Sequence, residues 1–114
     1  PATGRLADRF PEVSWTIAHA GMSWSFAEEV VASVREHPNV YAEITYTTVT
    51  NRCIEFLVRA ADENRVIFGT DQPFRDPRQQ LGWVVWADLP VGTRLKVLGG
   101  NFQRILDRVR LPGT

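Results

Sequence analysis

The stretch Arg65-Val66-Ile67-Phe68-Gly69-Thr70-Asp71-Gln72-Pro73 decides the fold. Its apolar run, residues 66–68, has no polar alternation, which is typical of a strand covered on both faces in a parallel sheet. Gly69 permits close approach of a backbone or ligand, and Pro73 cannot continue the ladder. An ionised Asp71 has no place in an apolar interior. We therefore predict a buried strand that delivers Asp71 to its exit, where α/β enzymes place their chemistry.

Two earlier apolar runs repeat the spacing of this strand. The runs open at Val13, Val40 and Val66, which lie 27 and 26 residues apart. That interval is the period of a βα unit, and a helical pattern follows each run. We predict an α/β fold with parallel strands in sequential order, near residues 14–19, 40–45 and 65–70.

Capping residues mark the helices that follow the strands. We expect Ser25 to cap the first, with Glu28 as its capping-box partner, and a Thr or Asn within 47–51 to cap the second. The third is predicted to begin at Asp76 with Pro77 in its first turn. Gln79 is predicted to be its capping-box partner. Its inward side chains are predicted to be Leu81, Val84 and Val85.

Helical patterns also occupy both ends of the chain. Residues 6–10 are typical of the last turns of a helix that begins before this chain, with Pro11 ending it. After a break at Leu89-Pro90, a short helical turn is predicted to end near Gly99-Gly100. Asn101 is then expected to cap a last amphipathic helix, whose apolar face carries Phe102, Ile105, Leu106 and Val109.

Composition sets outer limits on function. The 114 residues suffice for one small domain, and 44% of them are hydrophobic. Thirteen basic and thirteen acidic residues cancel, which indicates neither nucleic acid nor an anionic membrane as a partner. One cysteine excludes an internal disulfide framework, and two histidines give no Cys/His zinc pattern. No apolar run approaches a membrane span, so we expect a soluble, cytoplasmic protein.

The sequence resembles a known family at four places. Arg9-Phe10-Pro11 followed by Ile17-Ala18-His19-Ala20-Gly21, Asn39-Val40-Tyr41-Ala42-Glu43, residues 65–73 and Lys96-Val97-Leu98-Gly99-Gly100-Asn101 carry the likeness. These segments resemble the sixth, seventh and eighth barrel strands and the closing helix of amidohydrolase-related metal-dependent hydrolases. This branch of the amidohydrolase superfamily includes aminocarboxymuconate-semialdehyde decarboxylase. The likeness spans nearly the whole chain.

The resemblance implies that residues 1–114 form a single partial-barrel domain. It would be the C-terminal portion of a (β/α)8 TIM barrel, strands six to eight, with the N-terminal strands absent from this chain. By the same resemblance, Asp71 is a metal ligand and proton acceptor, and His19 is the catalytic imidazole. The implied cofactor is a divalent metal, zinc in the family. Its remaining ligands, a His-x-His pair on the first strand and a His on the fifth, lie outside this chain.

Physical chemistry supports these roles of His19 and Asp71, and it also offers a structural alternative for each residue. A carboxylate beside a metal accepts a proton from bound water, and imidazole has the right pKa to move that proton. The sixth and eighth strands of a barrel open onto the same mouth, so His19 and Asp71 can converge there. However, Thr70-Asp71 is also typical of a turn, and a lone histidine is often buried and bonded to backbone.

Other polar residues are assigned lesser roles. His37 suits the negative end of a helix, and Cys53 suits helix packing. Glu43 and Thr45 follow the second strand, and strand periodicity alone leaves open whether they face the site or the helices. The loop that follows Asp71 could line a substrate pocket with the side chains of Gln72, Phe74 and Arg75.

Two classes of function remain open. The first is the C-terminal part of a metal-dependent hydrolase or decarboxylase acting on a small carboxylated or cyclic substrate. The second is a catalytically silent partial barrel, stabilised by self-association or by a partner. A three-stranded parallel sheet leaves free edges at residues 13–18 and 66–68, which favours pairing with the missing barrel half or with a second copy. The chain alone is expected to show no hydrolytic activity.

Overall fold

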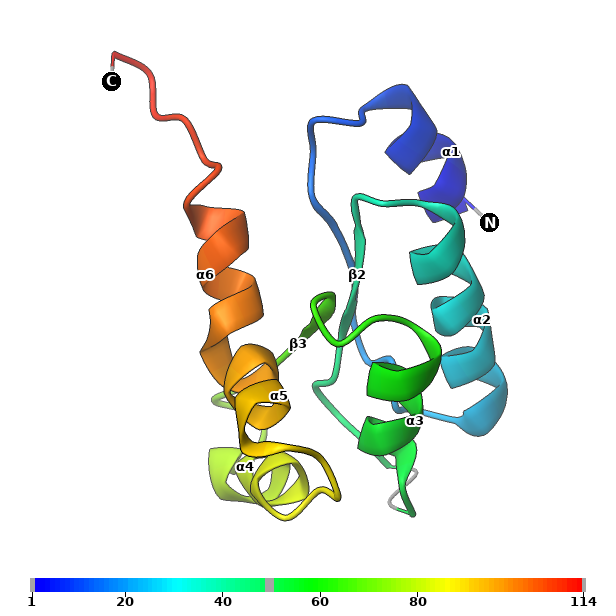
Figure 1. Cartoon of the computed structure of the whole chain (residues 1–114), viewed down its shortest axis with the longest axis vertical. Helices are drawn as coiled ribbons and strands as arrows, with labels where there is room; N and C mark the ends of the chain where they lie inside the picture. The colour runs from blue at the N-terminus through cyan, green and yellow to red at the C-terminus, as the bar shows by residue number, and fades with distance from the viewer. Residues whose placement is uncertain (1, 49–50, 114) are drawn as a thin grey trace.

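Three parallel strands form one sheet in the computed structural model, which describes residues 2–48 and 51–113. The strands are β1 (Trp15–Ile17), β2 (Val40–Glu43) and β3 (Val66–Ile67), in the spatial order β1-β2-β3 (Figure 1). Both pairs are parallel, with Ile17 opposite Ala42 and Ala42 opposite Val66. The predicted parallel, sequential sheet is confirmed. The strands are shorter than predicted because the chain turns sharply soon after each one.

Helices follow each strand, as the repeat predicted. They are α1 (Ala2–Arg9), α2 (Trp24–Glu36), α3 (Cys53–Ala60), α4 (Pro77–Val85), α5 (Val91–Leu95), the π-helical segment η1 (Lys96–Gly100) and α6 (Asn101–Leu106). Figure 1 shows α2 and α3 together on one side of β2, and the segment from α5 to α6 beside β3. No helix among the described residues is long and apolar enough to cross a membrane.

The core lies between β2 and the helices α2 and α3. Alternate residues of β2 and the segment after it, Val40, Ala42 and Ile44, are fully buried there. They share one apolar cluster with Val34 on α2 and Leu57 on α3. Because successive strand residues point to opposite faces, Tyr41 and Glu43 must face the other side of the sheet, away from these helices.

The starts of α2 and α3 differ from the prediction. Ser23, not Ser25, caps α2: its side chain accepts a hydrogen bond from the Phe26 N–H at 3.2 Å. The cap of α3 is Arg52, which has a left-handed backbone (φ 60°) and makes no side-chain capping bond. The prediction that a Thr or Asn within 47–51 caps this helix is therefore wrong for Thr47, Thr48 and Asn51. Val49 and Thr50 lie outside the residues that the structure describes.

Helix α4 begins as predicted and packs differently. Asp76 caps it by accepting from the Arg78 N–H at 2.9 Å, and Pro77 is its first residue. Val84 is fully buried, but Leu81 and Val85 are exposed, contrary to the predicted inward stripe. Of these three side chains, only Val84 belongs to the core cluster.

The break predicted at Leu89-Pro90 separates α4 from α5, but the helix that follows does not end near Gly99-Gly100 as predicted. Gly99 and Gly100 belong to η1, and Asn101 has helical φ and ψ, so Asn101 is not an N-cap. Its fully buried side chain instead donates to the carbonyls of Glu63 at 2.8 Å and Val66 at 2.7 Å. The helix ends at Leu106, so Val109 of the predicted apolar face lies beyond it; Phe102 and Leu106 are exposed and Ile105 is half-buried.

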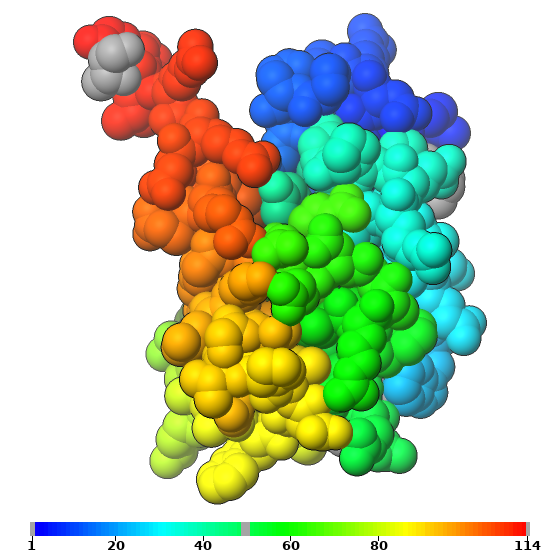
Figure 2. Space-filling view, viewed as in Figure 1, coloured from blue at the N-terminus to red at the C-terminus, as the bar shows by residue number. Residues whose placement is uncertain are grey.

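This helix covers the outer edge of β3. The Phe68 N–H donates to the Val97 carbonyl of η1 at 3.1 Å, and the Val66 carbonyl accepts from Asn101. Nearby, Thr93 donates to Glu63 at 2.7 Å and Lys96 forms an ion pair with the same carboxylate. Figure 2 shows the resulting contact between the green and orange segments. The edge predicted to be free at residues 66–68 is therefore already paired, and this part of the edge prediction is wrong.

Candidate active site

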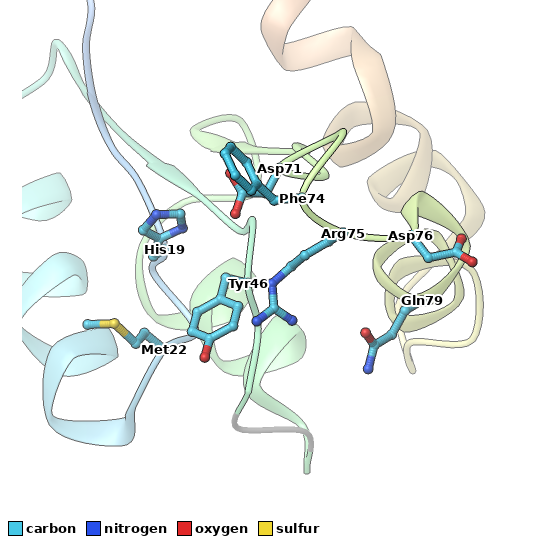
Figure 3. Close-up of a pocket in the computed structure, with 8 residues that line it drawn as sticks. All are labelled: His19, Met22, Tyr46, Asp71, Phe74, Arg75, Asp76 and Gln79. Carbon is cyan, nitrogen blue, oxygen red and sulfur yellow. The ribbon is translucent and has the colours of Figure 1, made fainter.

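A residue with left-handed backbone stands at the exit of every strand. His19, Tyr46 and Asp71 follow β1, β2 and β3, and each has φ 61°. Non-glycine residues adopt this conformation at a cost, and such strain is concentrated at functional sites. All three residues line one cavity of about 690 Å³. The three turns thus direct one side chain from each strand toward a common space (Figure 3).

The loop after β3 and the start of α4 supply most of the remaining lining. The cavity is completed by Met22, Phe74, Arg75, Asp76 and Gln79. The peptide bond between Gln72 and Pro73 in this loop is cis. The prediction that loop residues line a pocket is confirmed for Phe74 and Arg75, whereas Gln72 lines an adjoining cavity that also includes Asp71.

His19 is held by the backbone of the neighbouring strand exit. Its Nδ1 lies 3.2 Å from the carbonyl oxygen of Thr45. A carbonyl only accepts, so Nδ1 carries the hydrogen, and Nε2 keeps its lone pair when the ring is neutral. The ring also meets Tyr46 edge to face, with the centroids 6.0 Å apart. The backbone-bonded interpretation and the cavity-lining interpretation of His19 therefore both hold.

Asp71 combines turn geometry with an available carboxylate. Its carbonyl accepts from the Phe74 N–H at 2.9 Å, which is the turn that the sequence suggested. The side chain is exposed, and no described residue bonds or pairs with its carboxylate. Asp71 thus reaches the C-terminal edge of the sheet with free acceptor atoms.

Arg75 and Asp76, two charged residues that line the cavity, contact different kinds of partner. The guanidinium carbon of Arg75 lies over the Tyr46 ring, 3.6 Å from its centroid. Asp76 instead pairs with Arg78, whose Nε lies 3.0 Å from each of its carboxylate oxygens. Hydrogen bonds from the Arg78 side chain, and then from its backbone, lower the pKa of Asp76 to about 2.

Glu43 and Thr45 face the site side of the sheet, which answers the question that periodicity left open. One carboxylate oxygen of Glu43 accepts from the Thr45 N–H at 2.7 Å and from the Thr45 hydroxyl. Both residues line the adjoining cavity of about 420 Å³ with Gly69 and Asp71. A Cβ on Gly69 would lie 2.0 Å from the Glu43 carboxylate, so a side chain, rather than the predicted backbone or ligand, approaches this glycine closely.

The two remaining candidates of the sequence lie away from this site. His37 is buried at the end of α2, and its Nδ1 lies 2.9 Å from a carboxylate oxygen of Asp8 on α1. It therefore joins two helices in addition to ending one. Cys53 lies in the core, where burial and then the nearby Glu55 charge raise the pKa of its thiol to about 11. Packing is the role that was predicted for it.

The donor set suits a metal only in part. His19 Nε2 and the Asp71 carboxylate are suitable ligand atoms for a divalent metal and face one cavity. However, no group of three His, Cys, Asp or Glu residues in the described ranges 2–48 and 51–113 is placed to hold an ion. A catalytic zinc usually has three protein ligands. These residues therefore fit part of a metal site rather than a whole one.

Sequence reasoning missed four lining residues: Met22, Tyr46, Asp76 and Gln79. A signal was available for Tyr46, because it follows a predicted strand as His19 and Asp71 do. Asp76 and Gln79 were assigned to capping, and a helix start that borders a cavity supports both uses. Met22 follows Gly21 without any pattern that marks a site.

The chain belongs to the amidohydrolase family, whose sequence profile matches residues 1–108. Its fold is similar to that of an uncharacterized TIM-barrel protein from Bordetella bronchiseptica, with 21% identity and a TM-score of 0.74. That alignment covers 92% of this chain and 38% of the other. Among curated proteins, none matches.

Two decarboxylase structures share this partial fold. 5-Carboxyvanillate decarboxylase from Sphingomonas paucimobilis is 16% identical (TM-score 0.68), and the alignment covers 92% of this chain and 37% of the enzyme. 2,6-Dihydroxybenzoate decarboxylase in complex with 2,6-dihydroxybenzoate is 17% identical (TM-score 0.68), with 90% and 37% covered. The chain thus spans little more than a third of these proteins and forms part of a TIM barrel.

Proposed function

We propose that this chain is the C-terminal part of a metal-dependent hydrolase or decarboxylase that acts on a small carboxylated or cyclic substrate. One observation carries the proposal: His19 and Asp71, 52 residues apart in the sequence, line one cavity at the exits of β1 and β3. Their strained backbones and the family membership support it. The likeness to two decarboxylases is consistent with the decarboxylase branch.

The two side chains have complementary roles in this proposal. With Nδ1 donating to Thr45, His19 offers Nε2 to the cavity as the atom that takes up or releases a proton. Asp71 offers an unpaired carboxylate as a proton acceptor and as one ligand of a divalent metal. A bound divalent metal would supply Lewis-acid chemistry. The remaining ligands are proposed to come from barrel strands outside these 114 residues.

The test uses the complete polypeptide encoded by the reading frame that contains this chain. It is assayed with zinc for decarboxylation of hydroxybenzoates and hydrolysis of cyclic amides and esters. We expect Asp71→Asn and His19→Asn each to lower kcat/KM by about 100-fold or more, because each removes a proton-transfer group. The matched control is Asp107→Asn, which removes an exposed carboxylate at the C-terminal end of α6. Full activity of Asp71→Asn would contradict the proposal.

The second function is a catalytically silent barrel portion. The absence of a three-residue metal group among the described residues is expected of both functions and does not decide between them. The discriminating observation is a His-x-His pair in the adjacent coding sequence or in a second polypeptide. Its presence supports the enzyme, whereas a reading frame and partner without it support the silent protein.

A further inference from the structure

Arg75 is an unpaired cation in the cavity. Four arginines of the described chain pair with carboxylates, Arg52 and Arg59 with Asp88, Arg65 with Asp62, and Arg78 with Asp76, whereas several others, Arg9 among them, do not. For Arg75, by contrast, no carboxylate partner exists among the residues that the structure describes; its one recorded contact is the Tyr46 ring. The side chain is half-buried and lines the cavity together with His19 and Asp71.

The contact with Tyr46 fixes the guanidinium without consuming its donors. At 3.6 Å from the ring centroid, the cation lies over the aromatic face. Stacking occupies a face of the planar group, whereas its N–H donors lie in the plane and form a fork that matches a carboxylate. The donors therefore remain available to an anion in the cavity.

The supports of this pair are themselves fixed. Buried Gln80 on α4 accepts from the Thr47 N–H at 3.3 Å and donates to the Thr47 hydroxyl at 3.2 Å. These bonds join the start of α4, next to Arg75, to the segment that carries Tyr46. The geometry of the stack is thus held by residues on both sides of the cavity wall.

The nearest carboxylate in the sequence does not neutralise Arg75. Asp76 is engaged by Arg78, which lowers its pKa to about 2. Figure 3 shows the Arg75 side chain extending toward Tyr46 while the Asp76 carboxylate points away from it. The cavity therefore contains one unpaired cation, Arg75, and one unpaired carboxylate, Asp71, within the described chain.

We propose that Arg75, held by Tyr46, binds the carboxylate of the substrate and selects planar acids. The walls beside it suit a planar organic anion, because Tyr46, Phe74 and Met22 offer aromatic and thioether surface. This proposal rests on the proposed function, since it names the group that orients a substrate beside His19 and Asp71. Arg75 is then a specificity-determining residue.

The experiment titrates chain 1–114, without metal, with benzoate and with its neutral analogue benzamide. Binding is followed by NMR through the Arg75 Nε–Hε signal and the backbone amides. We expect benzoate to bind in the millimolar range and benzamide about tenfold more weakly, because a charge-assisted fork is lost. Equal binding of both probes, or no binding of benzoate, overturns the proposal.

Variants separate the stack from general charge effects. Arg75→Gln should weaken benzoate binding about tenfold, and Arg75→Lys should fall between the two, because it retains the charge but loses the fork. Tyr46→Phe should bind as the parent does, whereas Tyr46→Leu should bind more weakly. The matched control is Arg9→Gln, which removes an arginine that lies over Phe10 at 5.4 Å outside the cavity.

The outcome is independent of the test of the proposed function. If Arg75→Gln and Arg9→Gln bind benzoate equally well, Arg75 is not the receptor, although Asp71→Asn can still abolish catalysis. If Asp71→Asn keeps its activity while Arg75→Gln loses benzoate, the proposed reaction fails and the anion site remains. Backbone amide spectra of each variant confirm that the fold is retained.

Discussion

Gly69 marks the narrowest point at the site side of the sheet. A Cβ built at this residue would lie 2.0 Å from the Glu43 carboxylate and 2.4 Å from the Thr45 hydroxyl. The Glu43 carboxylate cannot retreat easily, since it accepts from both the N–H and the hydroxyl of Thr45. An added Cβ would therefore require the Glu43 side chain to shift from Thr45.

We expect Gly69→Ala to lower the free energy of unfolding by about 1–3 kcal/mol, because overpacking must displace Glu43. The control is Gly82→Ala on α4, where an added Cβ meets nothing within 4 Å. The same change in an open helical position should stabilise by about 0.5–1 kcal/mol. Urea unfolding measures both. Equal stability of the two variants would show that the contact with Glu43 does not constrain this position.

Two of the three residues at the strand exits were named from the sequence, and the third, Tyr46, was missed although it also follows a predicted strand. Asp71 follows an apolar run that ends in Gly-Thr, and His19 belongs to the segment that carries the family resemblance. Tyr46 stands at the equivalent place after β2, but an aromatic residue has no distinctive chemistry to mark it. Its role depends on a left-handed backbone and on Arg75 above it, which only three-dimensional geometry reveals.

At the scale of elements, Asn101 joins the C-terminal helix to the edge of β3. It donates to the carbonyls of Glu63 and Val66, and its own oxygen accepts from Arg104 at 2.5 Å. The side chain is fully buried. A buried amide with its partners in place is stabilising, whereas buried carbonyls without donors are costly.

Asn101→Leu, which keeps the volume but leaves both carbonyls without this donor, should lower the free energy of unfolding by about 2 kcal/mol. The exposed neighbour Gln103→Ala serves as control and should change it by less than about 0.5 kcal/mol. Chemical denaturation followed by circular dichroism gives both values. A neutral Asn101→Leu would mean that water or another group replaces the amide.

Local signals located the elements better than their ends. Asp76-Pro77 specifies a helix start through side-chain chemistry and fixed φ, and the structure begins α4 there. For α2, Ser23 and Ser25 are both possible caps from their residue type, and the structure uses Ser23, which has extended φ and ψ. At Gly99-Gly100 the sequence favours a stop, but packing of η1 on β3 and the buried Asn101 continue the helix. At Gly99-Gly100, tertiary contacts outweigh local preference.

For the whole molecule, the remaining unpaired edge of the described sheet is the outer edge of β1. The Trp15 N–H bonds inward to the Asn39 carbonyl, so the alternation of a parallel ladder directs the Thr16 backbone outward. The sheet order places no described strand beside it. Exposed parallel edges favour pairing with another chain.

We therefore expect chain 1–114 to self-associate at micromolar concentration, and Thr16→Pro, which removes the outward N–H, to weaken the association. The control is Val91→Pro at the exposed first residue of α5, where proline removes no helical hydrogen bond. Sedimentation velocity over a concentration series measures the effect, with circular dichroism to confirm folding. A compact monomer at every concentration would contradict this edge as an association site.

The central proposal is that Asp71 is one ligand of a metal site, with His19 beside it as the proton-transfer group, and that barrel strands outside these 114 residues supply the remaining ligands. Isothermal titration of zinc into chain 1–114, and into the complete polypeptide of its reading frame, tests the claim most directly. We expect weak binding by the 114 residues alone, stoichiometric tight binding by the complete polypeptide, and a marked loss of the latter in Asp71→Asn. Tight stoichiometric zinc binding by chain 1–114 alone, or an unchanged affinity in Asp71→Asn, would contradict it.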